Sequence, residues 1–192
     1  MNDISKNDKV SLLIITGLSG AGKTHCIKIL EDLGYFCVDN LPLKLLPGFA
    51  SLVKDLGKNE SQPTAVVVDI REGSNFVENL FEALSKLEKE NISYRIIFFE
   101  ADDEVLVRRF SETRRRHPLS HDGSILTAIM QERSLLASIR EKANFIIDTS
   151  NYTIKDLREK LTTILSLIGN SEEENLTINI IAFGYKSGIP ID

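Results

Sequence analysis

Hydrophobic and polar positions follow two alternating patterns along this chain of 192 residues. Short runs of branched apolar residues are typical of buried strands, whereas apolar residues three or four positions apart are typical of amphipathic helices. The apolar runs predict five strands, at residues 10–16, 35–38, 64–70, 94–99 and 144–147. The periodic segments predict six helices, at residues 25–33, 42–56, 75–90, 103–116, 124–142 and 154–167. Because helices separate the strands, we expect a three-layer α/β domain with a mainly parallel five-stranded sheet.

Several helix starts are marked by residues that favour them. Pro42 suits the first turn of a helix, because its missing N–H would have no intrahelical partner there. Two pairs fit the capping-box pattern, in which each side chain bonds the backbone of the other residue: Asn75 with Glu78, and Thr153 with Asp156.

The polar and acidic segment 169–175 (GNSEEEN) predicts a linker that follows a first domain at residues 1–168. Residues 176–183 (LTINIIAF) then predict a new strand, and the chain stops at residue 192. We therefore expect residues 176–192 to begin a carboxyl-terminal domain that is truncated. A terminal strand added to the first sheet would give the same pattern, so this alternative stays open.

Segment 17–24, GLSGAGKT, matches the phosphate-loop pattern G-x-x-x-x-G-K-[ST] at every fixed position and lies between a predicted strand and a predicted helix. Its glycines let backbone N–H groups turn toward phosphate oxygens, and the helix N-terminus adds the positive end of its dipole. The candidate nucleotide-binding residues of the loop are Gly17, Leu18, Ser19, Gly20, Ala21, Gly22, Lys23 and Thr24. The pattern predicts a P-loop NTPase or kinase-like domain that binds a nucleoside triphosphate.

Two side chains of the loop have expected chemical roles. Lys23 would bridge the β- and γ-phosphates as a catalytic residue, and the Thr24 hydroxyl would be a ligand of Mg²⁺. A second, acidic Mg²⁺ ligand is expected at the end of a neighbouring strand, where Asp69 and Asp39 both qualify. Asp69 follows the longer apolar run and is the preferred metal ligand and catalytic residue, whereas Asp39 could contact the water shell of the metal or an acceptor.

The charged segment that starts at Asp69 continues with Ile70, Arg71 and Glu72, and we expect it to face the nucleotide at the carboxyl edge of the sheet. Glu72 and Asp39 are candidates for the group that orients the attacking water, and neither stands out. Asp148 ends the last predicted strand at the same edge, and no role is assigned to it.

An arginine-rich segment follows the fourth predicted strand. It contains Arg108, Arg109, Arg114, Arg115 and Arg116, with His117 directly after them. Acidic residues four positions away can pair with two of these arginines, but Arg109, Arg114 and Arg115 have no local partner of this kind. These three could form a lid that stabilises charge on transferring phosphates, or could contact RNA. An ordinary solvated helix is the alternative.

Composition narrows the class of protein. The hydrophobic fraction of 42% is ordinary for a soluble protein, and the net charge of −5 argues against binding nucleic acid through bulk charge. The polar start, MNDISKNDKV, is no secretory signal, and no apolar run reaches membrane-spanning length. Cys26 and Cys37 are expected to be buried free thiols, with no zinc pattern among the cysteines and histidines. We expect a cytoplasmic protein with no membrane partner.

Five segments together resemble the RapZ/YvcJ family of bacterial nucleotide-binding proteins, also called RNase adapter proteins. They are GLSGAGKT, LEDLGYFCVDNLP (30–42), VVVDIRE (66–72), RRFSETRRRHPL (108–119) and FIIDTS (145–150). The tail FGYKSGIPID resembles the opening of the carboxyl-terminal domain of that family. VDNLP and RFSETRRRHPL are far more specific than the phosphate loop alone.

The resemblance implies binding of both ATP and GTP with slow hydrolysis, and it matches residues 69–72 to the guanine-nucleotide segment of the family. Family members with the regulatory role present a small RNA to an endoribonuclease and so tune amino-sugar synthesis. Most RNA binding in the family belongs to the carboxyl-terminal domain. The resemblance therefore implies nucleotide binding for this chain more directly than RNA handling.

Three functions remain open on the sequence. The first is a regulatory protein with weak ATPase and GTPase activity, and the second is an RNA-binding adapter whose nucleotide site sets its conformation. The third is a small-molecule kinase, because the loop also resembles those of sulfate- or sugar-phosphorylating enzymes. No N-K-x-D guanine motif is present, so the pattern does not choose between ATP and GTP. The oligomeric state is open too, a homo-oligomer included.

Overall fold

The computed structural model describes residues 12–56, 62–70, 75–113, 116–120 and 124–169. Its five strands are β1 (Leu12–Gly17), β2 (Phe36–Val38), β3 (Thr64–Val67), β4 (Tyr94–Glu100) and β5 (Phe145–Asp148). They form one sheet in the order β2-β3-β1-β4-β5, and every neighbouring pair is parallel. The predicted fold class, a three-layer α/β domain with a five-stranded parallel sheet, is confirmed.

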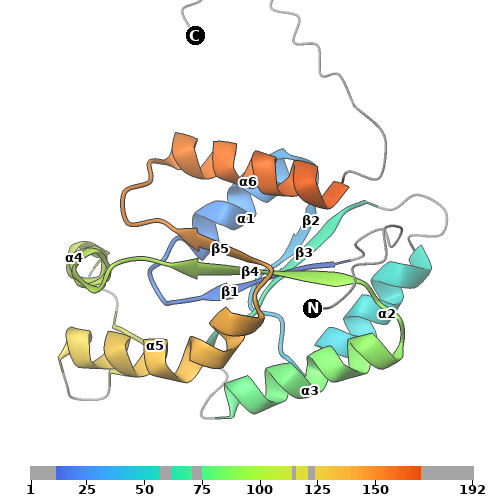
Figure 1. Ribbon diagram of the computed structural model, residues 1–192, viewed down its shortest axis with the longest axis horizontal. Coiled ribbons are helices and arrows are strands. Elements are labelled where there is room, and N and C mark those ends of the chain that lie inside the picture. The colour runs from blue at the N-terminus through green and yellow to red at the C-terminus, as the bar shows by residue number, and fades with distance from the viewer. Residues whose placement is uncertain (1–11, 57–61, 71–74, 114–115, 121–123, 170–192) are drawn as a thin grey trace, which may run out of the picture.

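Six helices pack around the sheet in the described part of the chain. They are α1 (Lys23–Asp32), α2 (Leu46–Leu56), α3 (Phe76–Lys89), α4 (Asp103–Thr113), α5 (Ile125–Lys142) and α6 (Ile154–Gly169). Figure 1 shows α1 and α6 over one face and α2, α3 and α5 under the other. Helix α4 lies beyond the carboxyl ends of the strands, at the left of the view. Within the described ranges, no helix is both long and apolar enough to cross a bilayer.

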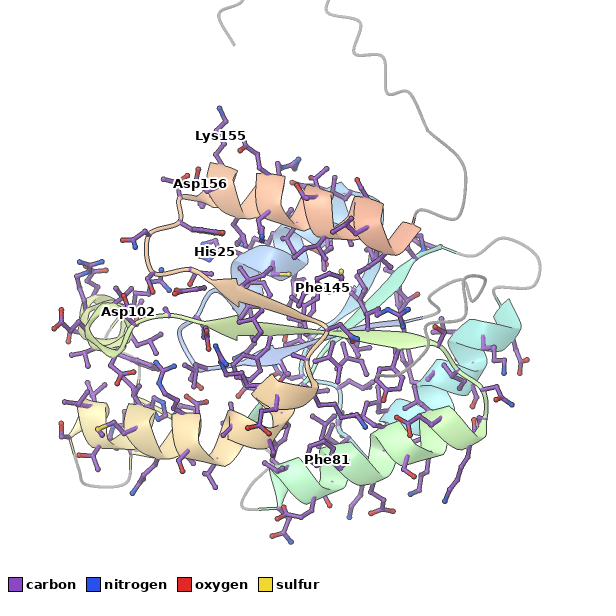
Figure 2. The ribbon with its side chains drawn as sticks, viewed as in Figure 1. His25, Phe81, Asp102, Phe145, Lys155 and Asp156 are labelled. Atoms are coloured by element: carbon purple, nitrogen blue, oxygen red, sulfur yellow. The ribbon has the colours of Figure 1, made fainter. Side chains whose placement is uncertain are left out.

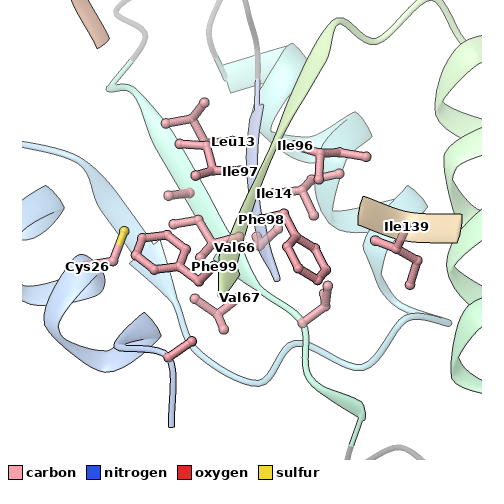
Figure 3. Packing of buried hydrophobic residues seen from close by; sticks show 14 of the residues in the cluster. Leu13, Ile14, Cys26, Val66, Val67, Ile96, Ile97, Phe98, Phe99 and Ile139 are labelled. Atoms are coloured by element: carbon pink, nitrogen blue, oxygen red, sulfur yellow. The ribbon is translucent and has the colours of Figure 1, made fainter. Parts of the chain in front are cut away.

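The core lies on both sides of the central strands. All six residues of β1 are buried, because helices cover both faces of the sheet and no position of the strand faces water. Side chains of three neighbouring strands, among them Ile14, Val66 and Phe99, pack together in Figure 3. Full burial of an aromatic side chain such as Phe98 stabilises the fold by about 1.5–3 kcal/mol.

The start of α2 differs from the prediction. Residues 43–45 form a turn, closed by a 2.8 Å hydrogen bond from the Leu45 N–H to the Pro42 carbonyl, and the helix begins only at Leu46. The proline in the first turn of α2 is therefore Pro47, not Pro42. A backbone N–H in the first turn has no intrahelical acceptor, so a proline there costs the helix no hydrogen bond. The prediction that a proline lies in the first turn was correct, but it named Pro42 instead of Pro47.

Two other helix ends also differ from the prediction. Helix α4 ends at Thr113, and Arg116 lies outside it, so the predicted end at 116 was too late. Asn75 is the N-cap of α3, but its side chain makes no cap hydrogen bond, so the predicted capping box with Glu78 does not form.

The capping box before α6 is confirmed. The Asp156 carboxylate accepts hydrogen bonds from the Thr153 N–H at 2.8 Å and from the Thr153 hydroxyl at 2.7 Å. In return, the Asp156 N–H donates to the Thr153 hydroxyl oxygen at 3.3 Å. Figure 2 shows Asp156 at the start of the helix. Helix α6 runs to Gly169, so this first residue of the predicted linker (169–175) belongs to the helix; the rest of the linker and the predicted second domain (176–192) lie outside the described residues.

The two cysteines are free thiols, as predicted, but only Cys26 is buried, while Cys37 on the edge strand β2 is half-buried. Burial, with the neighbouring Cys37 as a smaller cause, raises the pKa of Cys26. Burial, followed by the charge of Glu31, raises the pKa of Cys37 to about 11. Both thiols therefore stay protonated and unreactive near neutral pH.

Gly17, the last residue of β1, fixes where the central strand ends. Its φ of +129° lies outside the range of L-residues with a side chain. A Cβ at this position would lie 2.1 Å from the Phe99 carbonyl oxygen of β4. A side chain here is therefore excluded twice, by the backbone conformation and by the neighbouring strand.

We expect Gly17→Ala to lower the free energy of unfolding by about 3 kcal/mol or more, as backbone strain and a steric clash add together. Urea unfolding followed by circular dichroism measures this change. Gly48→Ala is the matched control: Gly48 lies in α2 with nothing within 4 Å of the added Cβ. The control should be neutral or more stable by up to about 1 kcal/mol. Equal stabilities of the two variants would contradict the close approach of β1 and β4.

Candidate phosphate-binding site

The segment 17–24 connects the central strand β1 to α1 and turns by means of its glycines. Gly20 has a φ of +82° and Gly22, the N-cap of α1, a φ of +102°. The side chains of Leu18 and Ala21 are fully buried in the core. These two residues anchor the loop, so its backbone polar groups face outward at the carboxyl edge of the sheet.

Four backbone N–H groups of the loop have no acceptor among the described residues: those of Gly20, Gly22, Lys23 and Thr24. The other N–H groups are engaged, since Leu18 donates to the Phe99 carbonyl at 2.9 Å and Ala21 donates back to the Leu18 carbonyl at 3.1 Å. Unpaired N–H groups at a helix N-terminus, together with the positive end of the helix dipole, attract an anion. The loop is thus shaped as a cradle for phosphate oxygens.

Lys23 bends back over the loop that precedes it. Its Nζ donates hydrogen bonds to the carbonyl oxygens of Gly17 at 2.6 Å and Leu18 at 3.0 Å. The same Nζ lies 3.6 Å from Oδ2 of Asp69, and the Lys23 residue is only 8% exposed. The ammonium group therefore lies at the cradle, where it can exchange its carbonyl contacts for phosphate oxygens.

The two residues predicted to hold Mg²⁺ come from different elements, and one of them lies beside this ammonium group. The Asp69 side chain follows β3, the direct neighbour of β1, and is 10% exposed. Thr24 is exposed in the first turn of α1. A carboxylate and a hydroxyl are hard oxygen ligands of the type that Mg²⁺ uses alongside phosphate oxygens, so the donor set fits this ion. No cluster of three or more His, Cys, Asp or Glu residues that could hold a metal alone occurs in the described ranges.

Two other predicted site residues, Ile70 after β3 and Asp39 after β2, are placed less favourably than Asp69. The Ile70 side chain is buried in the core, and Arg71 and Glu72 lie outside the described residues. Asp39 is exposed after β2, the edge strand, which β3 separates from β1. Asp148 accepts hydrogen bonds from the N–H and hydroxyl of Ser150, so its carboxylate stabilises the turn after β5.

Arg109 joins α4 to the phosphate loop. Its guanidinium donates to the Gly20 carbonyl at 3.1 Å and to the hydroxyl and carbonyl oxygens of Thr149 at 3.0 and 2.8 Å. Burial, with the like charge of Arg108 as a second cause, lowers the pKa of this guanidinium. Arg109 thus lacks a local helical partner, as predicted, but has partners distant in sequence.

Of the remaining arginines of the predicted lid, Arg108 and Arg116 are exposed, while Arg114 and Arg115 lie outside the described residues. Figure 2 shows Asp102, the residue before α4, at the carboxyl end of the sheet, on the same side as this helix. The whole segment that carries the arginines therefore starts beside the candidate site.

Thr149, directly after β5, completes this connection. Its hydroxyl donates to the Ala21 carbonyl at 2.9 Å and accepts from Arg109. The residue is 3% exposed. One hydroxyl group therefore holds the phosphate loop, α4 and the turn after β5 together.

A buried carboxylate supports the loop from the other side. Glu132 of α5 is 0% exposed, and its oxygens accept from the Ser19 N–H at 3.0 Å and the Ser19 hydroxyl at 2.8 Å. The third contact joins Oε2 to Nε2 of His117 at 3.0 Å. Burial alone would raise the pKa of this carboxyl, but the hydrogen bonds from His117 and Ser19, with the charge of Lys23, hold it below its usual value.

Glu132 and Thr149 were not predicted as site residues. Glu132 could have been noticed, because it stands on the apolar face of α5 with Ala128, Ile129 and Leu136, where an acidic side chain needs a buried partner. Thr149 lies in the segment FIIDTS, but nothing in that segment marks its hydroxyl, because its partners Ala21 and Arg109 are 128 and 40 positions away.

The fold and the loop define the class of this protein, a kinase-like P-loop α/β domain. The family model of the RapZ-like N-terminal domain matches residues 10–170, and the chain belongs to this family, as its motifs predicted.

Two relatives illustrate the family. A protein from Clostridium perfringens named nucleotide-binding protein is 52% identical over 181 residues, which is 94% of this chain and 60% of that protein. A protein from Syntrophomonas wolfei with the same name is 49% identical over 189 residues, or 97% of this chain and 62% of that protein. The chain thus spans about three-fifths of the length of these relatives.

Solved structures of a kinase and of an antibiotic resistance protein share the fold at low sequence identity. Shikimate kinase from Acinetobacter baumannii superposes with a TM-score of 0.56 at 15% identity, covering 84% of this chain and 95% of that one. The tunicamycin resistance protein of Deinococcus radiodurans gives a TM-score of 0.59 at 16% identity, covering 80% and 94%. At such identities these similarities establish the fold and nothing more.

We expect Thr149→Val to lower the free energy of unfolding by about 1–3 kcal/mol, because Ala21 and Arg109 each lose a buried hydrogen-bond partner. Thr149→Ser keeps the hydroxyl and is the matched control, which should lose clearly less. Urea titrations of both variants and the parent measure the difference. A valine variant as stable as the serine variant would contradict the bridging role of the hydroxyl.

Proposed function

We propose that this domain binds the triphosphate group of ATP and of GTP together with Mg²⁺, and hydrolyses it slowly as a regulatory switch. The observation that carries the proposal is the cradle itself: four N–H groups without a protein acceptor in the described chain, with the Lys23 ammonium beside them. Together they offer several donors to one anionic group, which is the arrangement that phosphate loops use.

The contacts of Lys23 indicate how the site would accept the triphosphate. In the structure its Nζ is held by two carbonyl oxygens and by the nearby Asp69. A γ-phosphate is a stronger partner for an ammonium group than a neutral carbonyl, because both partners are charged. Lys23 would therefore turn to the phosphates, and Asp69 would be left to hold the metal with Thr24.

The protein's own contribution to hydrolysis would be positioning and charge. Lys23 and the loop N–H groups would stabilise negative charge that develops on the phosphate oxygens. Mg²⁺ bound at Thr24 and Asp69 would neutralise part of the same charge. No residue stands out as the group that orients the attacking water, since Asp39 follows the edge strand and Glu72 lies outside the described residues. Slow turnover is what a site without a committed base should give.

The RNA-adapter and kinase functions make different demands. RNA binding in the longer relatives could involve residues beyond this chain, which spans only about three-fifths of their length. A kinase needs an acceptor, and Asp39 and the arginines of α4 could line its site at the carboxyl edge. Both remain outcomes that the experiment below separates from slow hydrolysis.

The first experiment is calorimetric titration of the purified chain with ATP and with GTP, with and without Mg²⁺, while phosphate release is followed in the same samples. Binding of both nucleotides with slow release in the absence of an acceptor supports the proposal. Release or transfer only after an acceptor is added would favour a kinase. Binding of RNA whose affinity falls steeply with salt would favour the adapter.

Lys23→Ala should weaken triphosphate binding about 10- to 100-fold, the loss expected for hydrogen bonds between charged groups. The fold should persist, because the variant removes a side chain that contacts loop carbonyls and one carboxylate rather than the core. Lys28→Ala, an exposed lysine of the same helix, is the matched control and should bind normally. If Lys23→Ala hydrolyses ATP at the parent rate, the assigned site is wrong.

Asp69→Asn should reduce Mg²⁺-dependent hydrolysis more than it reduces nucleotide binding, because a neutral amide is a poorer ligand for Mg²⁺ than a carboxylate. Asp39→Asn is the comparison, since Asp39 ends the edge strand, and it should change hydrolysis little. Phosphate-release rates at saturating nucleotide measure both effects. A larger loss for Asp39→Asn than for Asp69→Asn would exchange the roles of the two aspartates.

A further inference from the structure

Glu132 is a buried charge whose contacts all lead to the phosphate loop or to the segment before α5. Burying a carboxylate costs desolvation free energy unless it is fully hydrogen-bonded, and an apolar side chain at this position of α5 would be buried without that cost. Its three contacts are the N–H of Ser19, the hydroxyl of Ser19 and the ring of His117. A charge kept in the core for these contacts points to a role in holding the loop.

The protonation of His117 follows from its own contacts. Its Nδ1 accepts a hydrogen bond from the Leu119 N–H at 3.2 Å, so this nitrogen carries no proton. Nε2 must then carry the proton and donate it toward Oε2 of Glu132. The Glu132 carboxylate thus accepts from three donors, the N–H and hydroxyl of Ser19 and the Nε2–H of His117. The Phe110 ring, 5.0 Å from the imidazole centre to centre, and the Leu119 backbone fix the orientation of the histidine.

We infer that Glu132 is a positioning residue for the phosphate loop, which it holds through Ser19 in the shape of an open cradle before a triphosphate arrives. This inference rests on the proposed function, since the proposed function makes the triphosphate the ligand of the loop. The hydrogen bond to Glu132 turns the Ser19 N–H away from the cradle, while the N–H groups of Gly20 and Gly22 stay without an acceptor in the described chain.

Preorganisation is the physical effect of this contact. A loop that is already in its binding shape loses less conformational freedom when the ligand binds, so its affinity is higher. Glu132 contacts only Ser19 in the loop, and none of the N–H groups that would face phosphate. Its charge is negative, like that of the triphosphate, so it cannot attract the ligand itself. Its effect on affinity must pass through Ser19.

The test compares Glu132→Gln with the parent chain by calorimetry with ATP and Mg²⁺, and by amide hydrogen exchange of Ser19 measured by NMR. A glutamine is neutral. Its carbonyl oxygen can still accept from the Ser19 N–H and from His117, but its NH₂ group would face the Ser19 hydroxyl as a donor, so the carboxylate acceptor of the hydroxyl is lost and the other two hydrogen bonds are weaker without the charge. We expect ATP to bind about tenfold more weakly, the loss of one hydrogen bond to a charged group, with a smaller change in turnover at saturation. The Ser19 N–H, slow to exchange in the parent, should exchange fast in the variant.

Two further variants keep the test sharp. Glu141→Gln, an exposed glutamate on α5, makes the same change of charge without the contacts and should bind ATP normally. Ser19→Ala removes only the hydroxyl donor and should weaken ATP binding about threefold, the lower range for one hydrogen bond. In the Glu132→Gln background, Ser19→Ala should add nothing further, because the hydroxyl affects binding only through its contact with the Glu132 carboxylate.

The outcomes separate this inference from the proposed function. A folded Glu132→Gln variant that is less stable but binds ATP as tightly as the parent would overturn the inference and leave a purely structural role. Fast exchange of the Ser19 N–H in the parent would overturn it as well, and both this measurement and Ser19→Ala remain decisive if Glu132→Gln does not fold. If the parent binds neither ATP nor GTP, the proposed function fails, and the Ser19 exchange rates in parent and variant still decide whether Glu132 positions the loop.

Discussion

The close contact of the Gly17 backbone with the Phe99 backbone is the constraint on which the site depends. It brings the end of β1 against β4 so closely that no side chain fits between them. The next residue, Leu18, donates its N–H to the Phe99 carbonyl and buries its side chain. The chain therefore leaves the sheet at one fixed point and in one direction. Every later feature of the loop, from its free N–H groups to the placement of Lys23, starts from that point.

Charge is balanced around this loop with few groups. Lys23 and Arg109 supply two positive charges, and Asp69 beside Lys23 and Glu132 behind Ser19 supply two negative ones. The two acids differ in exposure and partners, because Asp69 is at the carboxyl edge of the sheet whereas Glu132 is closed off by Ser19 and His117. Asp69 can therefore exchange its partner when a ligand binds, whereas Glu132 cannot. The loop thus has a rigid support on one side and an exchangeable ion pair on the other.

The sequence allowed the layers, the strand positions and the phosphate loop to be predicted, since local patterns encode all three. Runs such as LLIIT mark a strand wherever it pairs, and the glycine spacing of 17–24 fixes a backbone shape. Asp69 was favoured over Asp39 for the length of its apolar run. The strand order supplies the better physical reason, because β3 lies next to β1 and β2 does not.

Features that depend on distant contacts could not be predicted in this way. The start of α2 depends on a turn that competes with the helix at Pro42, and propensity alone does not decide between two prolines. The contacts of Glu132 and Thr149 join segments that are 113 and 128 positions apart in sequence. Arg109 was noted only for lacking a local partner, and its real partners come from the loop and from the end of β5.

The bridge made by the Thr149 hydroxyl has a consequence for synthesis of the protein. The loop motif leaves the ribosome early, yet the residues that support it, Glu132 and Thr149, belong to the last third of the domain. Since chains are made from the amino end and fold as they emerge, a growing chain passes through a long stage with the motif present and its supports missing. A nascent chain at that stage holds a phosphate-loop sequence without a phosphate cradle. The cradle can thus form only after the last third of this domain has been made.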